Sequence, residues 1–365
     1  MNHNPEVYNF SSGPACLPPF VLEKIKAELT DWRAGMSVME VSHRSEAFLA
    51  LMKEMTERFK KILNIPKDFE VLYMHGGARM QFSAIPFNLF AQEKAVNYLV
   101  TGHWSKAAAA EAKKYAPVHI VADGESSRYT KIPPQHEWQI NLASHFLHYT
   151  DNETIQGVEF SAPPETDLAL ISDMTSSILS KPLDFSKYGL IYASAQKNLG
   201  IAGLTVVIIH KRFLDPNTQS IHPLTPSILN YQVMAESQSL YNTPPVFALY
   251  VLYWILKWAE QMGGISYFET KAKRVSQALY DFIDNSAFYQ TPVDPNYRSR
   301  LNIPFSLPSP ELEAAFLKEA SQKGLMFLEG HRSVGGCRAS LYNAMPEAGV
   351  KALISFMQSF EKTQS

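Results

Sequence analysis

The sequence has little cysteine, almost no net charge and no charge block of one sign. Its 365 residues include only two cysteines, Cys16 and Cys337, with no CxxC motif and no Cys/His spacing that suits zinc. We therefore expect two free thiols in a reducing compartment, and no metal site. The formal net charge of −2 gives no sign of a nucleic-acid or membrane-surface partner.

Membrane and secretory signals are also missing. The longest apolar run is VFALYVLYWIL at 246–256, shorter than the roughly 20 residues that span a bilayer. Lys257 and Glu260 follow it closely, so we expect a buried or interface helix there. The N-terminal stretch MNHNPEVYNF lacks the basic and apolar segments of a secretory signal. The expected location is the cytoplasm.

Strand-like and helix-like segments alternate in the first part of the chain. Apolar residues at 48, 52, 55, 59 and 62 predict an amphipathic helix that Ser45 caps. Apolar runs predict strands at 69–74, 96–100, 117–122, 167–172, 189–194 and 204–210, with helices at about 80–90 and 104–116. This order favours a mainly parallel sheet with helices on both faces.

The pattern changes after residue 262. A Gly-Gly break precedes a helix, and strands are expected at LNIPFSL, LMFLEGH and CRASLY, with helices at 309–323 and from Pro346. The sequence therefore predicts an α/β protein: a large domain at 16–262, and a smaller α+β domain formed by residues 1–15 and 263–365.

Ligands of such sheets bind beyond the carboxyl ends of the strands, which directs attention to residues 75–79, 101–104, Asp173 and Lys197. Lys197 lies in a short loop between two apolar strands. Desolvation there would lower the pKa of its amine and make it a nucleophile for a carbonyl group, either of a substrate or of pyridoxal phosphate.

Three other positions allow both a structural and a functional interpretation. Asp173 either caps a helix or pairs with the protonated pyridine nitrogen of pyridoxal phosphate. Trp104 either packs in the core or stacks on a cofactor ring. Gly77-Ala78-Arg79 opens a helix whose N-terminus favours a phosphate.

Several cations lie in loops or at the ends of predicted elements. Arginine grips a carboxylate or a phosphate with two hydrogen bonds, so a converging set would suit a substrate that carries both groups. The candidates are His43, Arg44, Arg79, His331, Arg332 and Arg338.

A series of motifs carries a resemblance to a known family. In chain order they are FSSGPA, MEVSHRS, HGGARMQF, TGHWSKAA, NETIQGVEF, DMTSSILS, YASAQKNLG, YNTPP and HRSVGGCRASLYNA. Together they resemble the phosphoserine aminotransferases, which are fold-type I pyridoxal-phosphate enzymes, over nearly the whole chain. The resemblance implies a large cofactor-binding domain, a smaller C-terminal domain and pyridoxal 5′-phosphate as cofactor.

The resemblance also implies a role for each candidate residue. Lys197 would hold the cofactor and shuttle a proton, Asp173 would pair with the pyridine nitrogen, and Trp104 would stack on the ring. Thr154 would contact the ring hydroxyl side. The cofactor phosphate would be held by Ala78, Arg79 and Gln196, with Asn242 and Thr243 of the other subunit. Arg338 would bind the substrate α-carboxylate. The substrate phosphate would lie among His43, Arg44, Arg79, His331 and Arg332.

The implied activity is reversible amino transfer from L-glutamate to 3-phosphohydroxypyruvate, which gives O-phosphoserine and 2-oxoglutarate, in a homodimer with shared sites. Family members also form 4-phosphohydroxythreonine in pyridoxal phosphate biosynthesis. One alternative is an alanine- or serine-glyoxylate aminotransferase of the same fold. The substrates of such an enzyme give no reason for so many cations around a substrate side chain. A sulfur-transferring relative would need a cysteine in a mobile loop. A catalytically silent scaffold that binds pyridoxal phosphate is disfavoured by the intact Lys197, Asp173 and Trp104.

Overall fold

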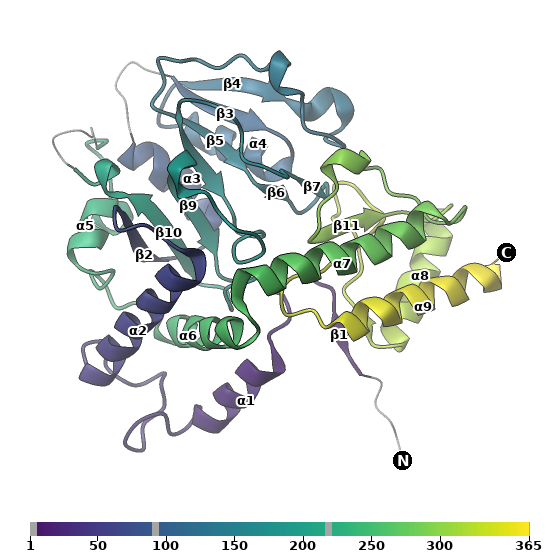
Figure 1. Cartoon of the computed structure of the whole chain (residues 1–365), viewed down its shortest axis with the longest axis horizontal. Coiled ribbons are helices and arrows are strands. Elements are labelled where there is room, and N and C mark those ends of the chain that lie inside the picture. Colours follow the sequence, from purple (N-terminus) through teal and green to yellow (C-terminus); the bar gives the residue numbers. More distant parts are fainter. Residues whose placement is uncertain (1–5, 90–94, 216–220, 365) are drawn as a thin grey trace.

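A seven-stranded sheet forms the centre of the computed structural model, which describes residues 6–89, 95–215 and 221–364 (Figure 1). The strands lie in the order β2 (Phe69–His75), β10 (Leu204–His210), β9 (Tyr188–Ser194), β8 (Ala169–Asp173), β5 (Phe146–Thr150), β3 (Val96–Val100) and β4 (Val118–Asp123). β10 runs antiparallel to both neighbours, and the remaining pairs are parallel. The predicted mainly parallel sheet is confirmed.

Helices cover both faces of this sheet. Helices α2 (Glu46–Leu63) and α6 (Val246–Gln261) pack on one face, and α3 (Ala78–Asn88), α4 (His103–Ala112) and α5 (Tyr231–Glu236) pack on the other. Successive side chains of a strand point to opposite faces, so Tyr73 joins the first apolar cluster and Met74 the second. The Ser45 hydroxyl accepts a hydrogen bond from the Phe48 N–H, which confirms the predicted cap of α2.

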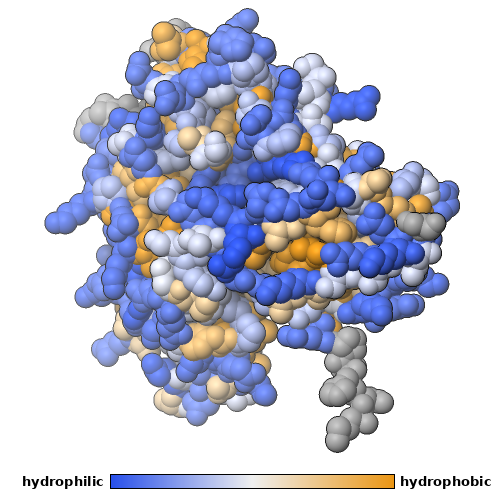
Figure 2. Space-filling model, turned by 45° about the vertical axis from the view of Figure 1, so that its right-hand side comes forward, coloured by the Kyte–Doolittle hydropathy of each residue, from blue (hydrophilic) through white to orange (hydrophobic). Residues whose placement is uncertain are grey.

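The apolar run at 246–256 belongs to α6, as expected. Its side chains contact the sheet, α2 and α1 (Pro19–Glu28). None of the helices in the described ranges is long and apolar enough to cross a bilayer. Figure 2 shows hydrophilic side chains over much of the face that it draws, with apolar side chains in smaller areas between them.

A second apolar core lies beside the sheet. It forms between α7 (Gly264–Asp284), α8 (Pro310–Gln322), α9 (Glu347–Gln364) and the antiparallel pair β11 (Asn302–Phe305) and β13 (Cys337–Ser340). The N-terminal strand β1 (Tyr8–Asn9) pairs with β12 (Leu325–Met326), and Tyr8 and Phe10 enter this core. The division into 16–262 and 1–15 with 263–365 stays a prediction, which this grouping supports.

Several elements differ from the predicted ones. The short strands β5, β6 (Asn152–Glu153) and β7 (Val158–Glu159) were not predicted, because their apolar runs are brief and interrupted by polar residues such as His148. Helix α3 begins at Ala78, where Gly77-Ala78-Arg79 was expected to open a helix, and Phe90 of the predicted helix lies outside the described residues. Helix α4 ends at Ala112, and only Leu325–Met326 of LMFLEGH is a strand.

Candidate active site

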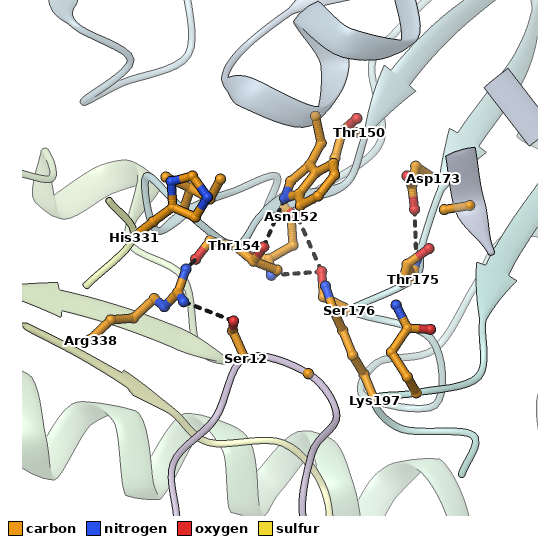
Figure 3. A pocket seen from close by; sticks show the side chains of 15 residues that line it. Ser12, Thr150, Asn152, Thr154, Asp173, Thr175, Ser176, Lys197, His331 and Arg338 are labelled. Carbon is orange, nitrogen blue, oxygen red and sulfur yellow. Dashed lines mark hydrogen bonds between the residues drawn. The ribbon is translucent and has the colours of Figure 1, made fainter. Parts of the chain in front are cut away.

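The strands β2, β3, β5, β8 and β9 run in one direction, so their carboxyl ends meet at one edge of the sheet. A cavity of about 190 Å³ lies at this edge (Figure 3). Many of the residues predicted for the site line it: Ala78, Trp104, Thr154, Asp173, Gln196, Lys197, His331 and Arg338. The structure therefore brings together residues from both cores of the molecule.

Lys197 lies in the loop between β9 and β10, and its side chain reaches into the cavity. Burial lowers the pKa of its amine to about 8; the Asp173 carboxylate opposes this shift and the Arg338 guanidinium adds to it. The amine lies 5.9 Å from the centre of the Tyr342 ring. A larger fraction of Lys197 than of an ordinary lysine is thus uncharged near neutral pH, as a nucleophilic amine requires.

Asp173 is the last residue of β8 and is buried. Its Oδ1 accepts a hydrogen bond of 2.9 Å from the Thr175 N–H. Burial raises the pKa of the Asp173 carboxyl, and the hydrogen bonds from Thr175 together with the charge of Lys197 oppose this rise. A turn follows Asp173, so the alternative that it caps an α-helix is wrong. The result is a carboxylate that faces a cavity with a lysine in it.

Trp104 is held in place from two directions. The buried Glu153 carboxylate accepts hydrogen bonds from the Trp104 N–H (2.9 Å) and the Ser105 N–H (2.8 Å) at the start of α4. The Trp104 indole N–H donates to the Thr154 hydroxyl oxygen at 2.9 Å. Because the Thr154 hydroxyl accepts this hydrogen bond, its own O–H remains available to donate to another group. Glu153 was not predicted as a site residue, because its sequence context is that of a polar loop.

The first turn of α3 borders the cavity through Ala78. Backbone N–H groups at a helix N-terminus have no partner within the helix and favour an anion. The Gln196 side-chain oxygen accepts a hydrogen bond from the Ser194 hydroxyl nearby. The Arg79 guanidinium lies 5.3 Å from the centre of the Trp104 ring. This set suits a phosphate group.

Arginine and histidine side chains lie in the cavity and next to it. Arg338 is buried and donates to the Thr154 carbonyl oxygen (3.0 Å) and the Ser12 hydroxyl (2.8 Å). The rings of His103 and His331 lie 5.7 Å apart. Burial is the main cause that lowers the pKa of both histidines. Neighbouring basic residues, Arg79 for His103 and Arg338 among others for His331, lower it further. His103 belongs to the stretch 101–104 that the strand ends pointed to, but no role was predicted for it.

The other predicted residues do not line the cavity. They are His43, Arg44, Arg79, Asn242, Thr243 and Arg332. Asn242 and Thr243 are exposed, and Thr243 lies in a separate hollow with Met39 and Pro245. Within one chain, Asn242 and Thr243 therefore contribute nothing to the cavity that contains Lys197.

Further polar residues of the cavity were missed by the sequence reasoning. Asn152 donates a hydrogen bond of 2.9 Å to the Ser176 hydroxyl, and both residues line the cavity. The Asn152 side-chain oxygen and the Thr150 hydroxyl are buried without a hydrogen-bond partner among the described residues. Unpartnered buried polar atoms in a cavity indicate a polar ligand.

Comparison with known proteins places this chain in a family. The family model of the class-V aminotransferases matches residues 7–353. A phosphoserine aminotransferase from Marinomonas sp. is 48% identical over 357 residues, which cover 98% of each chain. The chain belongs to the class-V aminotransferases and, within them, to the phosphoserine aminotransferase family.

Solved structures agree with this assignment. A phosphoserine aminotransferase from Bacillus circulans superposes with a TM-score of 0.95 at 42% identity, with 99% of each chain covered. A PLP-bound phosphoserine aminotransferase from Trichomonas vaginalis superposes with a TM-score of 0.93 at 41% identity, over 97% of this chain and 100% of the other. An alanine–glyoxylate aminotransferase from Nostoc sp. shares 18% identity at a TM-score of 0.75, a likeness that shows the fold alone. The resemblance drawn from the motifs is confirmed.

The cofactor of this family, pyridoxal 5′-phosphate, fits the residues of the cavity. A cationic pyridine nitrogen matches the buried Asp173, an aldehyde matches the Lys197 amine, and a flat ring matches the Trp104 indole. The start of α3 at Ala78 suits the cofactor phosphate. The Thr150 hydroxyl, which has no hydrogen-bond partner among the described residues, is available to bond a polar group of the cofactor. The chain is thus a transaminase that uses pyridoxal phosphate.

Lys197 sets an expected pH dependence of cofactor attachment. Below pH 8 the charged ammonium dominates, and above pH 8 the reactive neutral amine dominates, because its pKa lies at about 8. We expect the rate at which cofactor-free protein gains visible absorption, after pyridoxal phosphate is added, to rise with pH and level off above about 8. Lys197→Ala should gain none of this absorption. A rate that keeps rising towards pH 10.5 would contradict the lowered pKa.

Proposed function

We propose that this enzyme transfers the amino group of L-glutamate to 3-phosphohydroxypyruvate, giving O-phosphoserine and 2-oxoglutarate, as a step of serine biosynthesis. The observation that carries the proposal is one cavity that combines Lys197 and Asp173 with the Arg338 guanidinium and the His331 imidazole. The names of the full-length relatives support the same substrate. Formation of 4-phosphohydroxythreonine for pyridoxal phosphate biosynthesis is a second proposed activity of the same site.

The proposed chemistry divides between the cofactor and the chain. Pyridoxal phosphate, when bound, supplies a conjugated ring that accepts the electron pair left at the substrate Cα. Asp173 stabilises positive charge at the ring nitrogen. The neutral Lys197 amine takes the proton from the substrate Cα. It then gives this proton to the cofactor carbon that carries the aldehyde group in free pyridoxal phosphate. Trp104, fixed by Glu153 and Thr154, sets the plane of the ring.

The cations determine the proposed substrate class. Arg338 presents a planar fork to the α-carboxylate of either substrate. The remaining cations, proposed to be His43, Arg44, Arg79, His331 and Arg332, bind the second oxyanion. That oxyanion is a phosphate in one half of the reaction and the side-chain carboxylate of glutamate in the other. One set of arginine and histidine side chains serves both groups.

We further propose a homodimer with shared sites in the cytoplasm. Asn242 and Thr243 are exposed and lie outside the cavity of their own chain, which supports a role at the cofactor phosphate of a second chain. The free thiols of Cys16 and Cys337 support a reducing compartment.

An assay with two kinds of acceptor tests the proposed activity. Purified holoenzyme and glutamate should form 2-oxoglutarate rapidly with 3-phosphohydroxypyruvate and slowly with glyoxylate or pyruvate. Turnover restricted to glyoxylate or pyruvate would overturn the substrate and favour the glyoxylate-type alternative. A coloured holoenzyme without turnover on any acceptor would favour the silent scaffold.

Arg338→Ala tests the proposed carboxylate site. Truncating one partner of a buried charge pair costs about 2 to 4 kcal/mol, so KM should rise strongly for glutamate and for the phosphorylated acceptor alike. Arg298→Ala is a matched control, because Arg298 pairs with Asp284 at 2.6 Å and does not line the cavity. An unchanged KM for both substrates in Arg338→Ala would remove Arg338 from the site.

A hybrid dimer tests the shared site. Lys197→Ala and a double variant, Asn242→Ala with Thr243→Ala, should each be nearly inactive as homodimers. Unfolded and refolded together, they should regain part of the activity, because one site of each hybrid dimer then has intact residues from both chains. Recovered activity no greater than the sum of the separate samples would rule out the shared site.

A further inference from the structure

A row of large polar side chains crosses the sheet beneath α3 and α4. The register pairs Tyr98 of β3 with His148 of β5, His148 with Ile171 of β8, and Asp173 of β8 with Tyr192 of β9. Residues in register point to the same face, and Asp173 is two positions after Ile171. Tyr98, His148, Asp173 and Tyr192 therefore share one face, although only Asp173 borders the cavity.

Two of these side chains share a hydrogen bond, and a third lies beside them in register. The His148 Nε2 atom lies 2.9 Å from the Tyr192 hydroxyl oxygen. Tyr192 is also paired in register with Asp173 of β8, and its hydroxyl lowers the pKa of the Asp173 carboxyl. His148 and Tyr192 have no solvent exposure, so water does not compete for this bond. The series His148–Tyr192–Asp173 runs from the buried interior of the sheet to the edge of the cavity.

The chemistry of the groups determines the direction of each bond. An ionised Asp173 only accepts, so a hydrogen bond between Tyr192 and Asp173 takes the one hydroxyl proton of Tyr192. The Tyr192 oxygen is then free to accept from His148, which places the imidazole proton on Nε2. The other ring nitrogen, Nδ1, has no hydrogen-bond partner among the described residues and carries only a lone pair. Burial lowers the pKa of His148 to about 3, so the ring is neutral.

We propose that Tyr192 and His148 are positioning residues that hold Asp173 as an oriented anion against the cofactor ring nitrogen. The proposal rests on the role assigned to Asp173 under the proposed function. Tyr192 fixes the carboxylate by a hydrogen bond, and His148 fixes the Tyr192 hydroxyl so that its proton points to Asp173. The stacking of His148 on Tyr98, with ring centres 4.6 Å apart, sets the orientation of the imidazole.

The surroundings of Asp173 explain why such support is needed. Burial disfavours the anion, whereas Thr175, the charge of Lys197 and Tyr192 favour it. Lys197 gives up its charge when it acts as a nucleophile or a base. The hydrogen bonds of Thr175 and Tyr192 then remain to keep Asp173 ionised, and Tyr192 is the partner that comes from a different strand.

Two substitutions of similar shape separate this role from packing. Tyr192→Phe removes the hydroxyl that donates to Asp173. Tyr98→Phe is the matched control, because the Tyr98 hydroxyl lies on the same face and is buried without a hydrogen-bond partner among the described residues. His148→Gln keeps an N–H donor near the position of Nε2, whereas His148→Leu removes it.

The first readout is the pH midpoint at which the visible absorption band of the bound cofactor changes, measured on holoenzyme without substrate. A positive ring nitrogen lowers the proton affinity of the cofactor–Lys197 linkage. A weakened Asp173 anion should therefore move the midpoint of Tyr192→Phe to higher pH. Since no substrate is present, this readout does not depend on which acceptor the enzyme uses.

The second readout is steady-state kinetics. Tyr192→Phe should lower kcat about tenfold, the usual effect of one hydrogen bond to a charged group, and leave KM unchanged. Tyr98→Phe should match the wild type in both readouts, and His148→Gln should retain more of kcat than His148→Leu. A midpoint and kcat of Tyr192→Phe equal to those of Tyr98→Phe would overturn the proposal. If His148→Gln and His148→Leu lost equal fractions of kcat, His148 would have no part in the proposed support of Asp173.

Discussion

The structure of the site depends on two opposite charges buried at the ends of adjacent strands. Asp173 ends β8, and Lys197 follows β9, the next strand in the sheet. Either group alone would be driven to its neutral form by burial, and each lessens that tendency in the other. The pair gives the cavity a carboxylate and a reactive amine at the same pH. The remaining polar residues of the cavity are arranged around this pair.

The direction of the strands explains how much of the site the sequence predicts. Lys197, Asp173 and Trp104 follow apolar runs, and parallel strands bring the residues after such runs to one edge. The apolar runs themselves predicted most strands of the sheet. Glu153, Asn152 and His148 escaped prediction because their burial depends on tertiary packing. In the sequence, Glu153 belongs to a polar segment, and only the docking of α4 makes it a buried acceptor.

Hydrogen bonds join the cavity to the second core. Asn152 donates to the Asn302 side-chain oxygen at 2.8 Å, and Asn302 donates to Ser340 and to the Tyr342 hydroxyl. The Tyr342 hydroxyl donates to the Ser12 carbonyl oxygen at 2.9 Å. Residues from strands far apart in the chain thus share one buried network. Because such networks fix the relative orientation of their members, the cavity walls from the two cores keep a defined spacing.

The N-terminal segment gives this arrangement a consequence for synthesis of the protein. Ser12 lines the cavity and accepts a hydrogen bond from Arg338, while Tyr8 pairs with Leu325. Residues 8–12 leave the ribosome long before residues 325–338, so they wait for these partners during synthesis. Lys197 and Asp173 belong to the sheet of the first core, whereas the wall of the cavity that contains Ser12 and Arg338 needs both ends of the described chain. That wall is therefore completed only late in synthesis.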